Sequence, residues 1–563
     1  MEDVPDPLAV PEGCNPLAAQ WDCLLPFPSD HFTRDAPTPS GHLIAYSPQA
    51  VPRTVEGVSI DLNVAYPADG FSVATPILAV FPDGIDGSML TPVLGDYDRS
   101  RTLESPTLLL NARTGEAVAH IAELDPRAEQ EDRRALVMHP VVPLDEQTRY
   151  IVAIRGLDRP DGTRHAAAPG FAALRDAAAE DHPTLGPMQA RFETEVFPAL
   201  ASFGVVRADL QLAWDFTTGS REFSARDMLS MRASAMETFG ATPPAVTIAS
   251  VEEPEDSETV FRVVKGTLEV PLFLTDATVE GVTARGADGL PVQNGTAQAD
   301  FLMLIPHSVA QAQEPARVLQ YGHGFFGDRR EVMSMHAFAQ TTGMVVIAVD
   351  WWGMSERDRF PVAERIARRP ADAAQFIDRV HQAMVNQIAV PYALRAGLAE
   401  APEASVDGRL VYDPEQVYFY GISQGHILGG TYLALAPDVQ RGVLGVGGAG
   451  LSRMMFRALP FSAFMYVISL GLPDALDQQK WAGLSQTAFD RIDPITYAGW
   501  VRSGGPEPSP EREVLMQIGI GDASVPNLAA HLHARALGLP LVGEPARRLW
   551  GAQSAATPSD RSG

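Results

Sequence analysis

The stretch that most constrains this chain is Gly421-Ile422-Ser423-Gln424-Gly425, because a β-prone run (417–420) precedes it and a helix-compatible run (427–436) follows it. A Gly-x-Ser-x-Gly pentapeptide between a strand and a helix is typical of a nucleophile elbow, a strained turn that presents its serine at the end of a strand. The two glycines leave room for that turn. Ser423 is therefore a candidate nucleophile. The alternative is an ordinary glycine-rich turn at a sheet edge.

A chain of 563 residues is longer than one hydrophobic core usually accommodates, which predicts two or three domains. Short β-prone runs separated by turn residues indicate a β-rich, sandwich-like domain over 41–240, with a helical insertion at 170–205. Residues 1–40 are rich in Pro and Asp and are expected to be an extended segment. The Pro-Pro pair at 243–244 marks the boundary to the next part.

From about 245 onward, β-prone runs alternate with helical ones, which predicts an α/β domain over 241–563 with a mostly parallel sheet. We expect its strands near 260–274, 300–305, 318–321, 345–349, 417–420, 442–446 and 514–518. The alternation lapses over about 451–510, a stretch rich in Met, Phe, Trp and Leu. We interpret that stretch as a cap inserted over the site.

A net charge of −27 argues against nucleic acid and anionic membranes as partners, because both repel such a surface. The longest apolar run, 459–472, is too short to span a bilayer, so no transmembrane segment is expected. Neither charge nor composition indicates an oligomeric state.

The two cysteines, Cys14 and Cys23, lie close together in the N-terminal segment. Such a pair suggests a local disulfide and hence an exported protein, the alternative being two unrelated thiols. No second Cys/His pair follows at zinc-ligand spacing, so no metal site is expected. Residues 1–5 are acidic and do not form a signal peptide, so either a signal was removed or the protein stays inside the cell.

A serine hydrolase site also needs backbone amides that hold an oxyanion, and an earlier strand end supplies them. The segment His323-Gly324-Phe325 follows the strand expected at 318–321. We expect the amides of Phe325 and Gln424 to be the two donors. His323 precedes the serine in the chain and is interpreted as shaping this loop rather than as the base.

The candidate acid is Asp522, which follows the strand expected at 514–518. Catalytic groups in open α/β sheets lie at such strand ends, and an aspartate there can orient an imidazole. The alternative is a helix N-cap. Asp350 also ends a strand and is expected to shape the pocket, whereas Asp493 precedes a proline and is expected to be a turn residue.

The histidine is harder to place, since only His531 and His533 follow Asp522 and both lie in the helix predicted over 527–537. They are possible bases, but the alternative of helix-surface histidines fits the pattern better. Side chains expected to form a substrate pocket, with plain core packing as the alternative, are His323, Trp351, Trp352, Phe461, Phe464, Met465, Tyr466 and Trp481.

Short motifs in a specific order make this chain resemble bacterial extracellular lipases that carry a virulence-factor lipase N-terminal domain. In the N-terminal half they are residues 25–32, 69–76, 143–152 and 213–218, and in the C-terminal half 421–432 and 521–527. The resemblance implies an α/β-hydrolase fold, hydrolysis of small-molecule or lipid esters, export, and no cofactor. It carries over Ser423 as nucleophile and Asp522 as acid.

Two departures from that family matter. His426 stands where the family has a small residue, and the family's histidine lies beyond the point, near Gly543, where the resemblance ends. The pattern is that of a shortened C-terminus. The sequence thus supports a serine ester hydrolase of lipase or esterase type. A non-catalytic protein that keeps the fold is the alternative, and a peptidase on the same fold is a third possibility.

Overall fold

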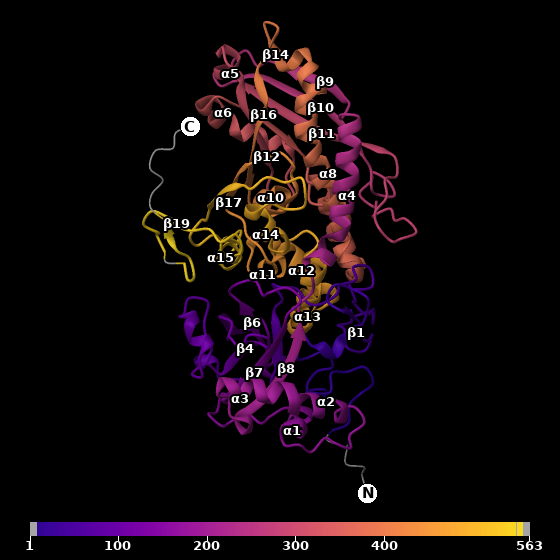
Figure 1. Ribbon diagram of the computed structural model, residues 1–563, viewed down its shortest axis with the longest axis vertical. Helices are drawn as coiled ribbons and strands as arrows, with labels where there is room; N and C mark the ends of the chain where they lie inside the picture. Colours follow the sequence, from indigo (N-terminus) through magenta and orange to yellow (C-terminus); the bar gives the residue numbers. More distant parts are fainter. Residues whose placement is uncertain (1–7, 548, 556–563) are drawn as a thin grey trace.

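The computed structural model describes residues 8–547 and 549–555, so the expectation for residues 1–5 lies outside the described residues. Figure 1 shows an elongated molecule with a β-rich N-terminal part at one end and a large sheet at the other. Helix α4 (Arg221–Ala241) runs from the first part into the second and packs beside α8 (Phe376–Arg395). Ser220 caps α4 by accepting a hydrogen bond from the Phe223 amide, which fixes where the helix begins.

Two three-stranded antiparallel sheets, in the orders β3-β6-β5 and β4-β7-β8, form the N-terminal part and share one apolar core. This is the β-rich, sandwich-like arrangement that the sequence predicts. The strands are β3 (Ile77–Val80), β4 (Thr107–Asn111), β5 (His120–Leu124), β6 (Ala135–Pro140), β7 (Arg149–Arg155) and β8 (Leu210–Thr217). The helical region predicted at 170–205 consists of α1 (Pro169–Arg175), α2 (Gly186–Arg191), a π-helical turn (Phe192–Val196) and α3 (Phe197–Phe203).

Residues 8–40 are mostly irregular, but they pack into this core rather than extending away from it. Phe27 and Phe32 are buried, and β1 (Thr33–Asp35) pairs with β2 (His42–Ile44). The indole of Trp214 donates to the Pro28 carbonyl at 2.7 Å, and Thr217 donates to Asp30 through its amide and its hydroxyl. Two of the family-like motifs therefore contact each other, and their role here is structural.

The large sheet has eight strands in the order β18-β17-β16-β12-β13-β11-β10-β9. The five strands from β18 to β13 are parallel, and β11, β10 and β9 continue the sheet antiparallel. This sheet, with helices on both faces and the Ser423 turn after β16, has the α/β-hydrolase fold. The strands are β9 (Val246–Glu252), β10 (Val260–Pro271), β11 (Thr296–Pro306), β12 (Ala316–Gly322), β13 (Met344–Val349), β16 (Tyr412–Ile422), β17 (Arg441–Gly445) and β18 (Glu513–Gln517).

Alternation along the strands divides the core into two layers, as the period of two requires. On β13, Val345, Ile347 and Val349 face the larger cluster, which includes side chains of α4 and α8. Val346 and Ala348 face a smaller cluster that includes Ala339 of α6 (His336–Thr342). Further helices and short strands are α5 (His307–Gln311), α7 (Arg359–Arg368), α9 (Gly397–Glu400), α10 (Gln424–Leu435), α15 (Asn527–Ala536), β14 (Ser405–Val406), β15 (Arg409–Leu410), β19 (Leu541–Val542) and β20 (Ser554–Ala555).

The stretch expected to form a cap is helical, with α11 (Leu451–Met455), α12 (Ser462–Gly471), α13 (Ala475–Phe489) and α14 (Pro494–Ser503). Leu476 and Leu484 of α13 are buried in the N-terminal core, so this stretch joins the two parts of the molecule (Figure 1). No single helix in the described ranges is long and apolar enough to cross a membrane. One sharply bent pair, 459–471 with 475–503, meets the same length and composition criteria only when both are taken together.

Candidate active site

Ser423 lies at the tip of a sharp turn, between the last residue of β16 and the first residue of α10. Its backbone has φ +57° and ψ −117°, a conformation that a non-glycine residue adopts only when its surroundings impose it. The flanking glycines allow the close packing around this turn. A Cβ on Gly421 would lie 2.0 Å from the Gly425 carbonyl oxygen, and one on Gly425 would lie 2.0 Å from the Gly322 oxygen.

Two backbone amides beside this turn, those of Gln424 and Phe325, donate no hydrogen bond within the described part of the chain. Other amides of the Phe325 loop are engaged. The Gly324 amide donates to Glu331 at 2.9 Å, and the Phe326 amide donates to the side-chain oxygen of Gln424 at 3.3 Å. The N-terminus of α10, which begins at Gln424, also directs the positive end of its helix dipole towards this turn. The two free amides are the pair that the sequence predicts as oxyanion donors.

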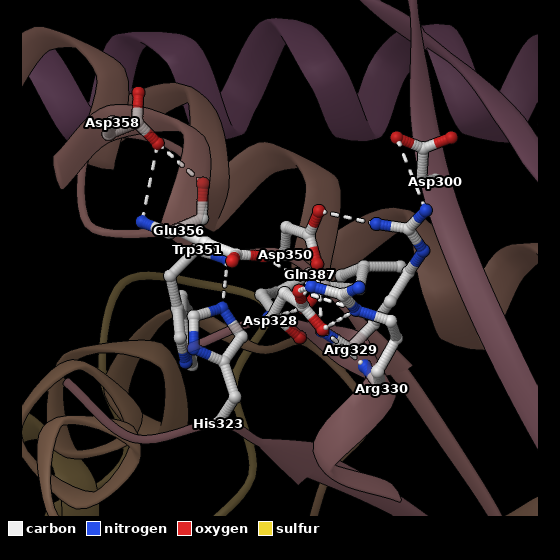
Figure 2. Close-up of polar contacts among 12 residues, drawn as sticks. Asp300, His323, Asp328, Arg329, Arg330, Asp350, Trp351, Glu356, Asp358 and Gln387 are labelled. Carbon is white, nitrogen blue, oxygen red and sulfur yellow. Dashed lines mark hydrogen bonds and ion pairs between the residues drawn. The ribbon is translucent and has the colours of Figure 1, made fainter. Parts of the chain in front are cut away.

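His323 uses both ring nitrogens to hold the loop that follows β12. Its Nδ1 donates to the Gly324 carbonyl at 3.0 Å. Its Nε2 accepts from the Trp351 amide at 2.8 Å, a contact that Figure 2 shows. Burial lowers the pKa of the His323 imidazole, so the ring is neutral. With both nitrogens engaged, this ring does not serve Ser423 as a base.

Ion pairs brace the segment after that loop, and Figure 2 shows them side by side. Asp350 accepts hydrogen bonds from the Arg329 amide and guanidinium, both at 2.8 Å. Burial raises the pKa of the Asp350 carboxyl, and Arg329 opposes that shift. Arg330 pairs with both Asp328 and Glu356. Asp350 thus holds Arg329, in the segment that follows the Phe325 loop, and it does not line the cavity that Ser423 lines.

Asp522 lies in the turn between β18 and α15. Its Oδ1 accepts from the amides of Ser524 and Val525, at 2.7 and 3.1 Å. Both of those residues line the same cavity as Ser423, so this turn adjoins the serine. The N-cap alternative is wrong, because α15 begins at Asn527 and its N-cap residue is Pro526. Asp493, expected in a turn, is instead the buried N-cap of α14.

Within the described residues, neither candidate base contacts Ser423. His533 is fully buried, and its Nδ1 lies 2.9 Å from Nε2 of His426, so it is not the surface histidine that the helix pattern suggests. His426 in turn accepts the Gly447 amide at its Nδ1. Burial lowers the pKa of His533 to about 3. Burial, reinforced by Arg535, lowers the pKa of His531 to about 4. Neither histidine has a hydrogen bond or ion pair with Ser423 or Asp522 in the described residues.

A cavity with about 1000 Å³ of empty space, its mouth included, opens beside Ser423. Its lining includes Phe461, Phe464 and Trp481, as expected from the cap sequence, and no charged side chain. The Phe464 ring stacks on Phe326, in the loop after β12, with ring centroids 5.4 Å apart. The other lining residues are Phe325, Met354, Val362, Ile366, Ala373, Ala374, Phe376, Gln424, Ile427, Leu451, Met454, Met455, Ala458, Pro460, Ser485, Phe489, Ser524 and Val525.

Three of the expected pocket residues, His323, Trp351 and Trp352, are outside that lining. Trp352 is buried with the guanidinium groups of Arg357 and Arg379 over its ring, at 4.2 and 5.0 Å from its centroid. Sequence reasoning missed the wall formed by α7, which carries Val362 and Ile366. Their spacing of four residues is the helical signal that identifies such a wall. Met465 and Tyr466 are likewise outside the lining.

The described residues contain no group of three or more His, Cys, Asp or Glu side chains placed to hold a metal ion. The disulfide suggested by the sequence is present between Cys14 and Cys23.

Comparison with known proteins gives no matching family model and no matching curated protein. Solved structures do match. Acetyl xylan esterase 1 from Thermoanaerobacterium sp. is 13% identical with a TM-score of 0.35, over 59% of this chain and 86% of that one. An acetyl xylan esterase from Paenibacillus sp. is 15% identical with a TM-score of 0.34, over 59% and 87%. Prolyl oligopeptidase B from Galerina marginata is 14% identical with a TM-score of 0.27, over 52% and 39%. Similarity this low leaves the reaction of this chain open.

Proposed function

We propose that this protein is a serine hydrolase that cleaves carboxylic esters whose acyl part enters the apolar cavity. The observation that carries the proposal is that Ser423, on a strained turn, lines that cavity together with Gln424 and Phe325, whose amides donate no hydrogen bond within the described residues. Ser423 attacks the ester carbonyl, the ester C–O bond breaks, and the alcohol leaves with the proton that Ser423 gives up. Water then hydrolyses the acyl-enzyme, which releases the carboxylic acid and restores Ser423. The amides of Gln424 and Phe325 hold the oxyanion. The lining has no charged group to pair with an ionic acyl part, so aliphatic and aromatic acyl groups fit best.

Asp522 has the role of orienting an imidazole. Its Oδ1 holds the 522–525 turn, while its Oδ2 has no hydrogen bond within the described residues. Because His531 and His533 lie elsewhere, free imidazole is a suitable probe for this position. An imidazole between the two side chains would take the Ser423 proton and donate its other N–H to Asp522.

The test measures hydrolysis of p-nitrophenyl butyrate and octanoate by the protein and by Ser423→Ala, with and without imidazole. We expect imidazole to raise the rate of the parent protein at least tenfold above its own background catalysis. The Ser423→Ala variant should gain nothing beyond that background, because the acyl-enzyme needs the hydroxyl. The octanoate ester should have the higher kcat/KM, since more apolar surface is buried.

Equal rates for the two proteins under all conditions would support the second candidate, a non-catalytic protein that retains the fold. The observation favouring that candidate is that neither histidine following Asp522 contacts Ser423 within the described residues, and that His533 is paired with His426.

Export is part of the proposal, and the Cys14–Cys23 disulfide supports it because such bonds persist in oxidising compartments. Thiol labelling of the protein isolated from its source checks this point. An oxidised pair fits export, whereas two free thiols contradict it.

A further inference from the structure

The side chain of Gln424 connects three loops around the proposed oxyanion site. Its Oε1 accepts the Phe326 amide at 3.3 Å, and its Nε2 donates to the Met354 carbonyl at 2.9 Å. The residue itself follows Ser423 and is buried. One side chain thus links the nucleophile turn, the loop that carries Phe325, and the loop after β13 that contributes Met354 to the cavity wall.

Phe326, whose amide donates to the Gln424 side chain, has a strained backbone conformation. Phe326 has φ +48°, in the left-handed region that side chains other than glycine rarely adopt. A backbone in that region keeps its shape only when its surroundings hold it. On the other side of the free amide of Phe325, the Gly324 amide is fixed by Glu331 at 2.9 Å. The Gly324 carbonyl, which shares its peptide unit with the Phe325 N–H, accepts from His323 Nδ1 and from the Gly327 amide, both at 3.0 Å. The direction of the Phe325 N–H therefore depends on these contacts together with Glu331 before it and the Gln424 side chain after it.

We propose that the Gln424 side chain is a positioning residue that aims the Phe325 amide at the oxyanion. This inference rests on the proposed function for its catalytic consequence, but its structural content is independent of turnover. Gln424 then has two separate roles. Its amide is one donor, and its carboxamide holds the loop that supplies the other.

The test replaces Gln424 with methionine, which has a similar length and makes no comparable hydrogen bonds. The matched control is Gln382→Met in α8. Gln382 is also buried, and its side chain likewise accepts a backbone amide (Phe273, 2.9 Å) and donates to a backbone carbonyl (Pro271, 3.0 Å), far from the site in the sequence. Any general loss of stability should appear in both variants.

Hydrogen exchange of the peptide that covers 323–327 is the first readout, because it requires no catalysis. We expect exchange of the Phe326 amide to rise at least tenfold in Gln424→Met and to stay at the parent value in Gln382→Met. Unchanged exchange in Gln424→Met would overturn the proposal, whatever the enzyme assay shows.

The second readout is ester hydrolysis in the presence of imidazole. Misplacing one oxyanion donor should lower kcat by roughly 10- to 100-fold with KM nearly unchanged, somewhat less than removing the donor. An equal loss in both variants would mean that Gln424 supports only the fold. If the parent protein does not turn over at all, the proposed function fails while the exchange result still decides the positioning role.

Discussion

At the scale of single residues, the turn at Ser423 requires glycines, because a Cβ atom at Gly421 or Gly425 would clash with the backbone. Gly425 lies against the end of β12, where a Cβ would lie 2.0 Å from the Gly322 carbonyl oxygen. That close approach brings the start of α10 against the loop after β12, which carries Phe325. Ser423 can adopt its strained backbone conformation because Gly421 and Gly425 carry no Cβ that would block the close packing of the turn.

We therefore expect Gly425→Ala to lower the free energy of unfolding by about 1–3 kcal/mol or more, the usual cost of overpacking. The same substitution at Gly240 in α4, where a Cβ meets no atom within 4 Å, should be neutral or stabilising by about 0.5–1 kcal/mol. Urea unfolding of both variants measures the difference. Parent-like stability of Gly425→Ala would contradict the close approach.

At the scale of elements, α10 and α15 are joined by the buried pair His426 and His533. Each imidazole is neutral, because burial lowers both pKa values. His426 accepts the Gly447 amide at Nδ1, so its Nε2–H donates to Nδ1 of His533. His426, at a position where the family resemblance predicts a small residue, is thereby accommodated by its hydrogen bond with His533 of α15.

This pair predicts acid sensitivity. His533 titrates near pH 6.5 when unfolded and near 3 when folded, so stability is complete above about pH 6.5 and falls as the pH drops towards 3. At about pH 5 the loss from this residue is about 2 kcal/mol. The decrease in unfolding free energy from about pH 7.5 to about pH 5 should shrink by that amount in His533→Gln.

At the scale of the whole molecule, the two parts are joined by polar contacts that α13 and its C-terminal turn carry. Ser72 donates to Asp490 at 2.7 Å, and Arg133 pairs with Asp474 at 2.9 Å. Leu476 and Leu484 add an apolar contact with the N-terminal core. The helical stretch over 451–503 therefore covers the cavity on one side and holds the N-terminal part on the other.

Asp490 makes this joint dependent on pH. Burial raises the pKa of its carboxyl to about 8, so the folded protein keeps a proton that the unfolded chain loses above about pH 4. Stability from this group is therefore greatest at low pH and decreases up to about pH 8. Asp490→Asn should raise the unfolding free energy at about pH 8 by more than about 1 kcal/mol, and by less at about pH 4.5. A uniform change at both pH values would contradict this assignment.

Local pattern was enough for much of this protein. Strand and helix periods around Ser423 predicted the elbow, and the strand ends predicted Asp522, Phe325 and Gln424, because these features depend on neighbours in the chain. Tertiary structure alone decided the remainder, because packing joins residues distant in sequence. It buried His533 against His426, brought α7 to the cavity wall, placed Trp352 against Arg357 and outside the cavity lining, and packed residues 24–32 into the N-terminal core.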